Sequence, residues 1–349
     1  MRNLFRATSV VFVLVLAAKA LVFVRDAVLV ARLGTTATTD AFYASLNIVN
    51  FVLYLSGINA MRSVVTTTYA RGRLDARSSE IYLSSLVYLL VPYALLASLP
   101  PLVFPEFVIS TFLPGFDAGA RSNAVPYVRA LALLVFARGL SQILESLLGV
   151  AKRFFLQNVF MPIVNVAVIG ALLMSSREGA ILNVCFVMVS TYGLACLVQS
   201  VVVGGRGFRL KVVPRPLLRE YLTDFVRLAY PLLFVTAAFS LAGVVDKAVA
   251  SFFEAGVITS LNLAHTLCFV FIAIFLDPLS RVLFPRFADV YHRGDLGTLK
   301  SDFNRGQLLV FSIFVPISLF IVFFAKDVIY ALYFRMSFSA EDATNTACF

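Results

Sequence analysis

Residues 180–205 read AILNVCFVMVSTYGLACLVQSVVVGG, and no Asp, Glu, Lys or Arg interrupts them. About 20 consecutive apolar residues carry a helix across the hydrocarbon core of a bilayer. The whole chain is strongly apolar: 60% of its 349 residues are hydrophobic, 14% are charged and the mean hydropathy is +0.91. This composition is too apolar for a water-soluble domain. The sequence therefore predicts an all-α integral membrane protein, a polytopic helical bundle.

Further spans flank this stretch on both sides. Six are uncharged, at residues 41–61, 81–104, 154–176, 228–245, 255–276 and 307–325, and two are interrupted by charges, at residues 8–31 and 123–150. About nine spans result, which leaves little chain for a catalytic domain outside the membrane. We do not expect residues 8–31 to be a cleaved signal peptide, since the apolar run continues into a charged helical segment.

Basic residues predict the orientation of these spans. With the N-terminus in the cytoplasm, sixteen Lys and Arg residues fall in inner segments and five in outer ones. Short loops rich in Lys and Arg resist translocation, so a cytoplasmic N-terminus is expected. This topology also accounts for the net charge of +10. No basic run is interleaved with aromatic residues, and nucleic acid is not an expected partner.

The chain contains no recognisable catalytic or metal-binding motif. Its four cysteines have no paired or metal-ligand spacing. A phosphate-binding glycine loop, a His-Glu metal motif and a nucleophile elbow are also missing from the sequence. We therefore expect neither an enzyme nor a cofactor.

The longest inner connection, residues 204–227, ends in a segment with apolar residues at helical spacing. The apolar residues are Leu217, Leu218, Tyr221, Leu222, Phe225 and Val226, and the opposite face holds Arg219, Glu220, Thr223, Asp224 and Arg227. This pattern favours an amphipathic helix on the cytoplasmic leaflet, with an extension of the next span as the alternative. The expected domains are a six-span lobe at 1–203, this linker at 204–227, and an incomplete lobe of about three spans at 228–349.

An offset of 222 positions reveals an internal repeat. It aligns Arg25 with Lys247, Gly34 with Gly256, Tyr69 with Tyr291, Arg71 with Arg293, and Gly72 with Gly294. Six spans return a chain to its starting side, so the two units are expected to be parallel, as in alternating-access carriers. Residue 349 corresponds to residue 127, so about 95 residues of the second unit are missing, and we expect residues 337–349 to form an outer loop with the first turn of a further helix. Such a chain is not expected to transport alone.

Charged side chains inside the spans are the strongest functional signal. Each costs about 2.5 to 3.5 kcal/mol to insert, so it usually faces a polar partner or a water-filled cavity. Lys19 and Asp26 are seven residues apart and share a helix face, with Arg25 beside them. The repeat pairs Arg25 with Lys247, so each half is expected to present a cation to one central cavity, with Asp246 next to it. The alternative is that Arg25 and Asp26 lie at the outer interface or pair with a neighbouring helix.

Span 123–150 carries a second polar stripe. Arg138, Ser141, Gln142 and Glu145 recur at three-to-four spacing, with Arg129 further out. This stripe either lines a pathway or joins helices. In the eighth span, Asp277 and Arg281 favour a structural ion pair, and His265 a hydrogen-bonded span residue.

Two sets of residues resemble a known family. FVRDA at 23–27, Gly34, TDAF at 39–42 and Asn50 resemble the N-terminal signature of the MurJ (MviN) lipid II flippases. Pro231, VAS at 249–251, Gly256 and LFP at 283–285 resemble the start of that family's second half. The similarity covers essentially the whole chain, although the family normally has about fourteen spans.

The resemblance implies a transport function. Members of this family move a polyprenyl pyrophosphate-linked sugar across the bacterial inner membrane for peptidoglycan synthesis, using a cationic cavity between two six-span lobes. By resemblance, Arg25 and Asp26 match the family's motif pair, Lys19 replaces an arginine, and Asp40 and Asn50 belong to the polar pathway. The implied partners are the lipid-linked glycan pyrophosphate, membrane lipids and cell-wall synthesis proteins.

Departures from the family pattern leave alternatives open. Leu53 and Thr266 occupy positions where the family has cavity arginines, and Val245-Asp246-Lys247 resembles the acidic-basic pair of related oligosaccharide flippases. A flippase for an O-antigen or exopolysaccharide precursor is one alternative, and a non-transporting scaffold is another. A cation-coupled antiporter would need a carboxylate-lined cavity, which the basic excess of the first span disfavours.

Overall fold

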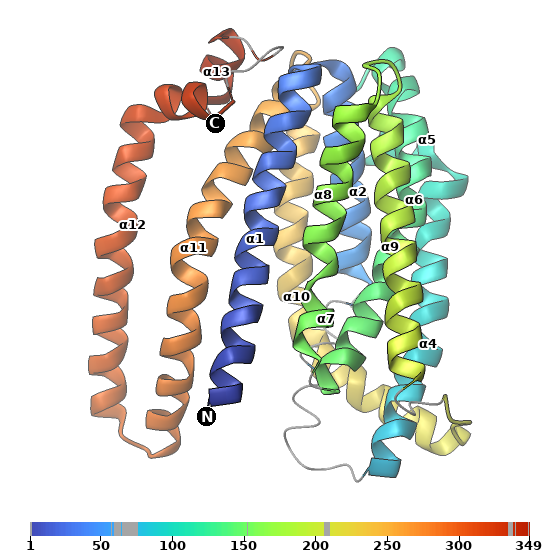
Figure 1. Cartoon of the computed structure of the whole chain (residues 1–349), viewed down its shortest axis with the longest axis vertical. Coiled ribbons are helices and arrows are strands. Elements are labelled where there is room, and N and C mark those ends of the chain that lie inside the picture. The colour runs from blue at the N-terminus through green and yellow to red at the C-terminus, as the bar shows by residue number, and fades with distance from the viewer. Residues whose placement is uncertain are drawn as a thin grey trace.

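The computed structural model describes residues 2–56, 58, 64, 76–151, 153–205, 210–333, 338, 340–347 and 349. Within these ranges the ordered elements are all helices, arranged as a bundle along one long axis (Figure 1). They are α1 (Arg2–Leu33), α2 (Ala37–Leu55), α4 (Ala76–Val103), α5 (Pro105–Phe112), α6 (Ala118–Val150), α7 (Phe154–Asn158), α8 (Phe160–Met174), α9 (Ala180–Gly204), α10 (Arg215–Ala250), α11 (Val257–His292), α12 (Leu296–Tyr333) and α13 (Ala340–Ala347).

Each of the nine predicted spans overlaps a helix, which confirms the fold class. Among the described residues, six helices are long and apolar enough to cross a bilayer: α4, α6, α9, α10, α11 and α12. α8 is apolar but has only 15 residues. The span predicted at 154–176 divides into α7 and α8 at Val159, because Pro162 has no N–H to donate to the carbonyl of residue 158. The count of nine spans stays a prediction.

The segment 215–227 is not a separate helix. It is continuous with the following span, so the alternative interpretation of the linker is confirmed. Figure 1 shows this yellow part of α10 running crosswise below the bundle before the helix turns upward. Part of its apolar face packs on protein, since the Tyr221 ring lies 5.4 Å from that of Tyr82 and Phe225 is buried. The position of this segment on the cytoplasmic leaflet stays a prediction.

The helices of the second half follow those of the first at the predicted offset. α6 begins at Ala118, and adding 222 gives residue 340, where α13 begins. Residues 340–347, expected to be mostly loop, are therefore helical. The paired turn glycines Gly34 and Gly256 both have positive φ angles, of 72° and 101°. The other landmarks of the first unit, Tyr69, Arg71 and Gly72, lie outside the described residues.

A break in one helix also recurs in its partner. α4 ends at Val103, and Phe104 has non-helical angles before α5 begins. In α12 the backbone leaves helical geometry at Phe324, which corresponds to residue 102. The shape of the first unit is thus repeated in the second as far as the described chain extends.

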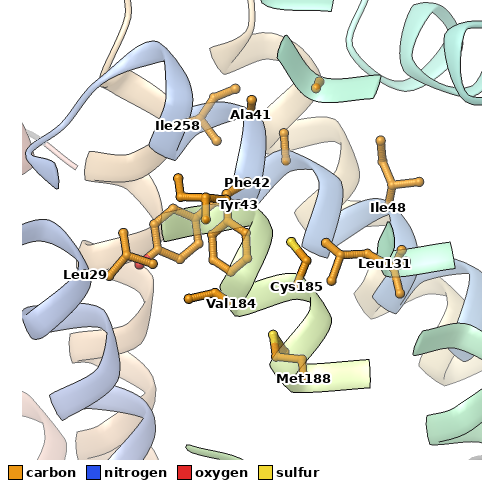
Figure 2. Packing of buried hydrophobic residues seen from close by; sticks show 14 of the residues in the cluster. Leu29, Ala41, Phe42, Tyr43, Ile48, Leu131, Val184, Cys185, Met188 and Ile258 are labelled. Carbon is orange, nitrogen blue, oxygen red and sulfur yellow. The ribbon is translucent and has the colours of Figure 1, made fainter. Parts of the chain in front are cut away.

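The core lies in the first half, around α6. This helix packs most extensively against α9, α4 and α2, while α1 packs on α8 and α11. Figure 2 shows part of this core, in which Phe42 and Tyr43 of α2 meet Leu29 of α1 and Val184 of α9. α12 is much less enclosed. Four of its 38 residues are buried, namely Asp302, Gly306, Ile329 and Tyr333. The first half thus supplies a rigid frame for polar groups.

The turn between α10 and α11 packs closely against the turn between α1 and α2, and substitutions at glycine can test this contact. Gly256 has a φ of 101°, and a Cβ there would lie 2.9 Å from the carbonyl oxygen of Thr35. Gly294 also has a positive φ, of 74°, but a Cβ there would meet nothing within 4 Å. We expect Gly294→Ala to cost about 1 kcal/mol of stability through the backbone angle alone, and Gly256→Ala roughly twice that. Thermal unfolding of the purified variants in detergent measures both, and equal losses would show that the contact with Thr35 is unimportant.

Candidate functional site

A buried ion pair lies in the C-terminal half of α1. The Nε and Nη2 atoms of Arg25 donate hydrogen bonds to Oδ1 of Asp26, at 3.0 and 2.7 Å. Asp26 is fully buried and Arg25 is 9% exposed. A paired arrangement is expected here, because an isolated charge inside the membrane is far more costly. Both side chains are enclosed by protein, which fits the alternative in which they pair with a neighbouring helix.

Two further helices contribute polar groups to this pair. Nη1 of Arg25 donates to Oδ1 of Asn165 on α8, at 3.4 Å, and Oγ1 of Thr266 on α11 donates to Oδ2 of Asp26, at 3.1 Å. Asn165 is itself held by a bond from its Nδ2 to the carbonyl oxygen of Met161. We call Arg25, Asp26, Asn165 and Thr266 the buried charge cluster. It joins α1 of the first half to α11 of the second.

The sequence pointed to only part of this cluster. Asn165 was not singled out, although a lone amide in an apolar span is a usable signal for a buried hydrogen bond. Thr266 was noted only as a position without an arginine. In the structure its hydroxyl still contacts the carboxylate of Asp26, so the position keeps a polar contact without the positive charge.

Lys19 lies closer to the N-terminus of α1, about 9 Å along the helix from Arg25. It lines a pocket of about 130 Å³ together with Arg138, Gln142 and Glu145 of α6. Residues from α7, α8 and α9 complete the wall: Gln157, Asn158, Met161 and Tyr192. The guanidinium carbon of Arg138 lies 5.5 Å from the centre of the Tyr192 ring, within the range of a cation–π contact. We call this cavity the α1–α6 pocket.

The polar stripe of α6 serves two purposes. Ser141 hydrogen-bonds to Gln199 of α9 at 3.0 Å and to Glu145 at 3.3 Å, so it joins helices. Arg138 and Glu145 line the α1–α6 pocket. The interpretation that the stripe joins helices is thus confirmed for Ser141, whereas a pathway lined by Arg138 and Glu145 stays a prediction. Arg129, in contrast, lies exposed on α6.

Asp40 joins the two halves at the opposite end of the molecule. Its Oδ2 accepts from the N–H of Gly256 at 2.6 Å, and its Oδ1 accepts from the N–H and hydroxyl of Thr259 at 2.7 and 2.5 Å. A carboxylate at this position caps the first turn of α11 and interacts favourably with the helix dipole. Asp40 is 5% exposed and also lines a pocket of about 400 Å³, so its place in a polar pathway stays a prediction. Asn50 lies half-buried on α2.

The remaining sequence candidates lie apart from the cluster. Lys247 is buried on α10, which packs against α2, whereas its neighbour Asp246 is exposed. Within the described part of the chain, Lys247 is not hydrogen-bonded to the buried charge cluster. His265 packs edge-on against Phe269, at 5.0 Å between ring centres. The side chains of Asp277 and Arg281 lie outside the described residues.

Comparisons with known proteins place the chain in a family. A family model described as lipid II flippase MurJ matches residues 29–349. The probable lipid II flippase MurJ of Aquifex aeolicus is 25% identical over 366 aligned positions, which cover 99% of this chain and 68% of that protein. Its counterpart in Thermotoga maritima is 24% identical over 324 positions, covering 93% and 65%. The chain thus spans about two thirds of the length of these relatives.

Solved structures show the same fold. A lipid II flippase MurJ in an inward closed conformation superposes with a TM-score of 0.80 at 19% identity, covering 96% of this chain and 69% of that one. An inward-facing multidrug resistance transporter of the MATE family gives a TM-score of 0.69 at 16% identity, covering 95% and 75%. At these identities the likeness concerns the fold alone. The family model matches most of the sequence, and the chain therefore belongs to the MurJ family of lipid II flippases.

Proposed function

We propose that this protein takes part in moving lipid II from the inner to the outer leaflet of the bacterial inner membrane by alternating access. The observation that carries the proposal is the buried charge cluster, which places an arginine-aspartate pair between α1 and α11. Charges at this depth are expensive, so they are kept where they bind a substrate or change partners during transport. No bond is made or broken in such a process, and no cofactor is required.

The residues have distinct roles in this proposal. Lys19, Arg25 and Lys247 neutralise the pyrophosphate of the substrate, and Asp26 holds Arg25 and exchanges partners between states. Residues 1–203 form one lobe, residues 204–227 a linker, and residues 228–349 the described part of a second lobe. Because Asp26 and Asp40 both bond to α11, rocking of the lobes requires these contacts to change.

The proposed direction of transport requires a cytoplasmic N-terminus. The segments rich in Lys and Arg would then face the cytoplasm. We expect cysteines placed at Arg77 and Lys300 to be shielded in intact cells from a membrane-impermeant thiol reagent, and a cysteine at Ser175 to react. Labelling at residues 77 and 300 but not at 175 would reverse the orientation.

A direct test uses both binding and transport. The purified 349-residue chain, in lipid nanodiscs, should bind lipid II more tightly than a phospholipid of equal charge. In cells, the chain is expressed in a strain depleted of its own lipid II flippase, with and without co-expression of the C-terminal third of a relative. Growth in either case supports the proposal. The absence of both binding and growth would contradict it.

A second candidate substrate is another polyprenyl pyrophosphate-linked oligosaccharide, such as an O-antigen or exopolysaccharide precursor. The observation that favours it is Thr266, which contacts Asp26 where an arginine would add a positive charge. In the same nanodiscs, tighter binding of such an oligosaccharide than of lipid II would establish this alternative. A scaffold for cell-wall synthesis proteins, the third hypothesis, would bind neither lipid.

A further inference from the structure

Two buried tyrosines beside the buried charge cluster have hydroxyl groups without a hydrogen bond. Tyr43 of α2 and Tyr333 of α12 are 2% and 1% exposed, and neither phenol oxygen has a hydrogen-bond partner among the described residues. A hydroxyl group enclosed in this way costs free energy, and phenylalanine would fill the same space without that cost. The two hydroxyl groups are therefore expected to find a partner in another conformation.

Both rings lie next to the turn of α1 that carries Asp26. The centre of the Tyr333 ring is 5.3 Å from that of Phe23, three residues before Asp26. Figure 2 shows the Tyr43 ring reaching from α2 towards Leu29, three residues after Asp26, with the phenol oxygen at that end. Residues three apart lie on neighbouring turns along one side of a helix. The carboxylate of Asp26 also acts electrostatically on both phenols, so it lies within their range.

The carboxylate of Asp26 has other donors in this conformation. Its Oδ1 accepts both hydrogen bonds from Arg25, and its Oδ2 accepts one from Thr266. If Arg25 withdraws, Oδ1 loses both donors. A fully buried carboxylate is costly unless new donors replace those that it loses. The hydroxyl groups of Tyr43 and Tyr333 are able to do so, because each can donate one hydrogen bond.

We propose that Tyr43 and Tyr333 are the partners to which Asp26 changes when Arg25 leaves it during transport. The proposal rests on the proposed function, in which Asp26 exchanges partners, and it names the groups that replace Arg25. Tyr43 belongs to the first half of the molecule and Tyr333 to the second, so the exchange joins the two lobes. Both tyrosines act through Asp26 and are positioning residues, without a contact to the substrate.

A thermodynamic cycle of stabilities tests the exchange directly. In the parent, Tyr43→Phe and Tyr333→Phe remove hydroxyl groups that bond to no described residue, so the melting temperature should stay the same or rise slightly. In Arg25→Met the phenols hold the carboxylate, and each change should lower the melting temperature by several degrees. Thermal unfolding of the 349-residue chain in nanodiscs measures both. Equal shifts in the two backgrounds would overturn the proposal.

Two control variants separate the exchange from ordinary packing. Thr266→Val removes a hydroxyl group that already bonds to Asp26, so it should lower the melting temperature of the parent itself. Tyr82→Phe removes a buried phenol hydroxyl in the separate core around α4, and it should have the same effect in the parent and in Arg25→Met. If Tyr82→Phe depends on the background as strongly as Tyr43→Phe does, the coupling is not specific to Asp26 and the proposal is wrong.

Binding of lipid II gives a second, independent measurement. The double variant Tyr43→Phe with Tyr333→Phe should bind lipid II in nanodiscs about tenfold more weakly than the parent, because Arg25 can then leave Asp26 only at a higher cost. It should melt at the same temperature as the parent. This measurement also decides the question if Arg25→Met does not fold. Unchanged binding, or a loss of binding together with a loss of stability, would contradict the exchange.

The outcomes distinguish this inference from the proposed function. If the parent binds lipid II, the double phenylalanine variant binds it equally well and the cycle shows no coupling, the exchange is wrong and the flippase proposal stands. If the cycle shows coupling but the parent neither binds lipid II nor supports growth, the proposed function fails, and the exchange has no role in transport.

Discussion

Replacing Asp40 with alanine should weaken the contact between the two halves of the molecule by about 3 kcal/mol. The substitution removes the acceptor for the N–H groups of Gly256 and Thr259 and for the hydroxyl of Thr259. A buried donor left without a partner costs about 1 to 3 kcal/mol, and a lost helix cap about 1 kcal/mol. The melting temperature of the purified variant should fall. A cysteine pair placed across the α2–α11 contact should also cross-link more slowly.

Asp117 provides a matched control for this effect. It also caps a helix, accepting a hydrogen bond from the N–H of Ala120 at 2.6 Å, but it lies at an exposed position on α6. Asp117→Ala should therefore lower the melting temperature less and leave the α2–α11 cross-linking rate unchanged. If the two alanine variants behave alike, Asp40 is an ordinary cap and not a connection between the halves.

The second large effect is expected at the buried charge cluster. Arg25→Met leaves Asp26 fully buried, with Thr266 and without its cation. Breaking a buried ion pair by removing one partner typically costs about 3 to 5 kcal/mol, whereas replacing both partners with apolar residues is often close to neutral. We therefore expect Arg25→Met to be strongly destabilised. The double variant Arg25→Met with Asp26→Leu should regain most of that stability.

The transport activity of the single and double variants should not follow their stability. Both variants are expected to lose complementation of a flippase-depleted strain, because neither keeps the cation. A double variant that is stable and still transports would show that the ion pair only holds helices together. Arg286→Met is the control, since Arg286 also forms a bidentate pair, with Asp302, but its side chain is 60% exposed. Because water reaches the guanidinium group of this pair, Arg286→Met should cost less stability than Arg25→Met and should leave complementation intact.

The fold was largely predictable because its main signals are local in the sequence. Uncharged stretches such as 180–205 are long enough to define spans without knowledge of their neighbours. The repeat offset also predicted that a further helix begins near the end of the chain, although α13 starts earlier than expected, at Ala340. The continuity of α10 was harder to predict. An amphipathic pattern describes one face of a helix and does not say where the helix ends or what covers that face.

The candidate site was predicted less completely, because its contacts join distant segments. Arg25 and Asp26 stand out as charges in an apolar span, but nothing local indicates that Asn165, 140 residues away, accepts from Arg25. Asp40 was expected in a polar pathway, whereas its bonds go to the first turn of α11. Which helix end a carboxylate reaches depends on tertiary packing, and a single sequence carries no direct record of that.

Because most of α12 is exposed, this helix should be the first to move when a mechanical force pulls on the C-terminus. α12 contacts α11 and α13, and to a smaller extent α1, and the Arg286–Asp302 pair links α11 and α12 near their connecting turn. A force applied at the C-terminus should therefore pull α12 away at low force, whereas α11 should stay attached through its bonds to Asp26 and Asp40. The helices around α6 should resist until a second, higher rupture. Under a pulling force, the molecule should therefore behave as a mechanically stable bundle around α6 from which α12 detaches easily.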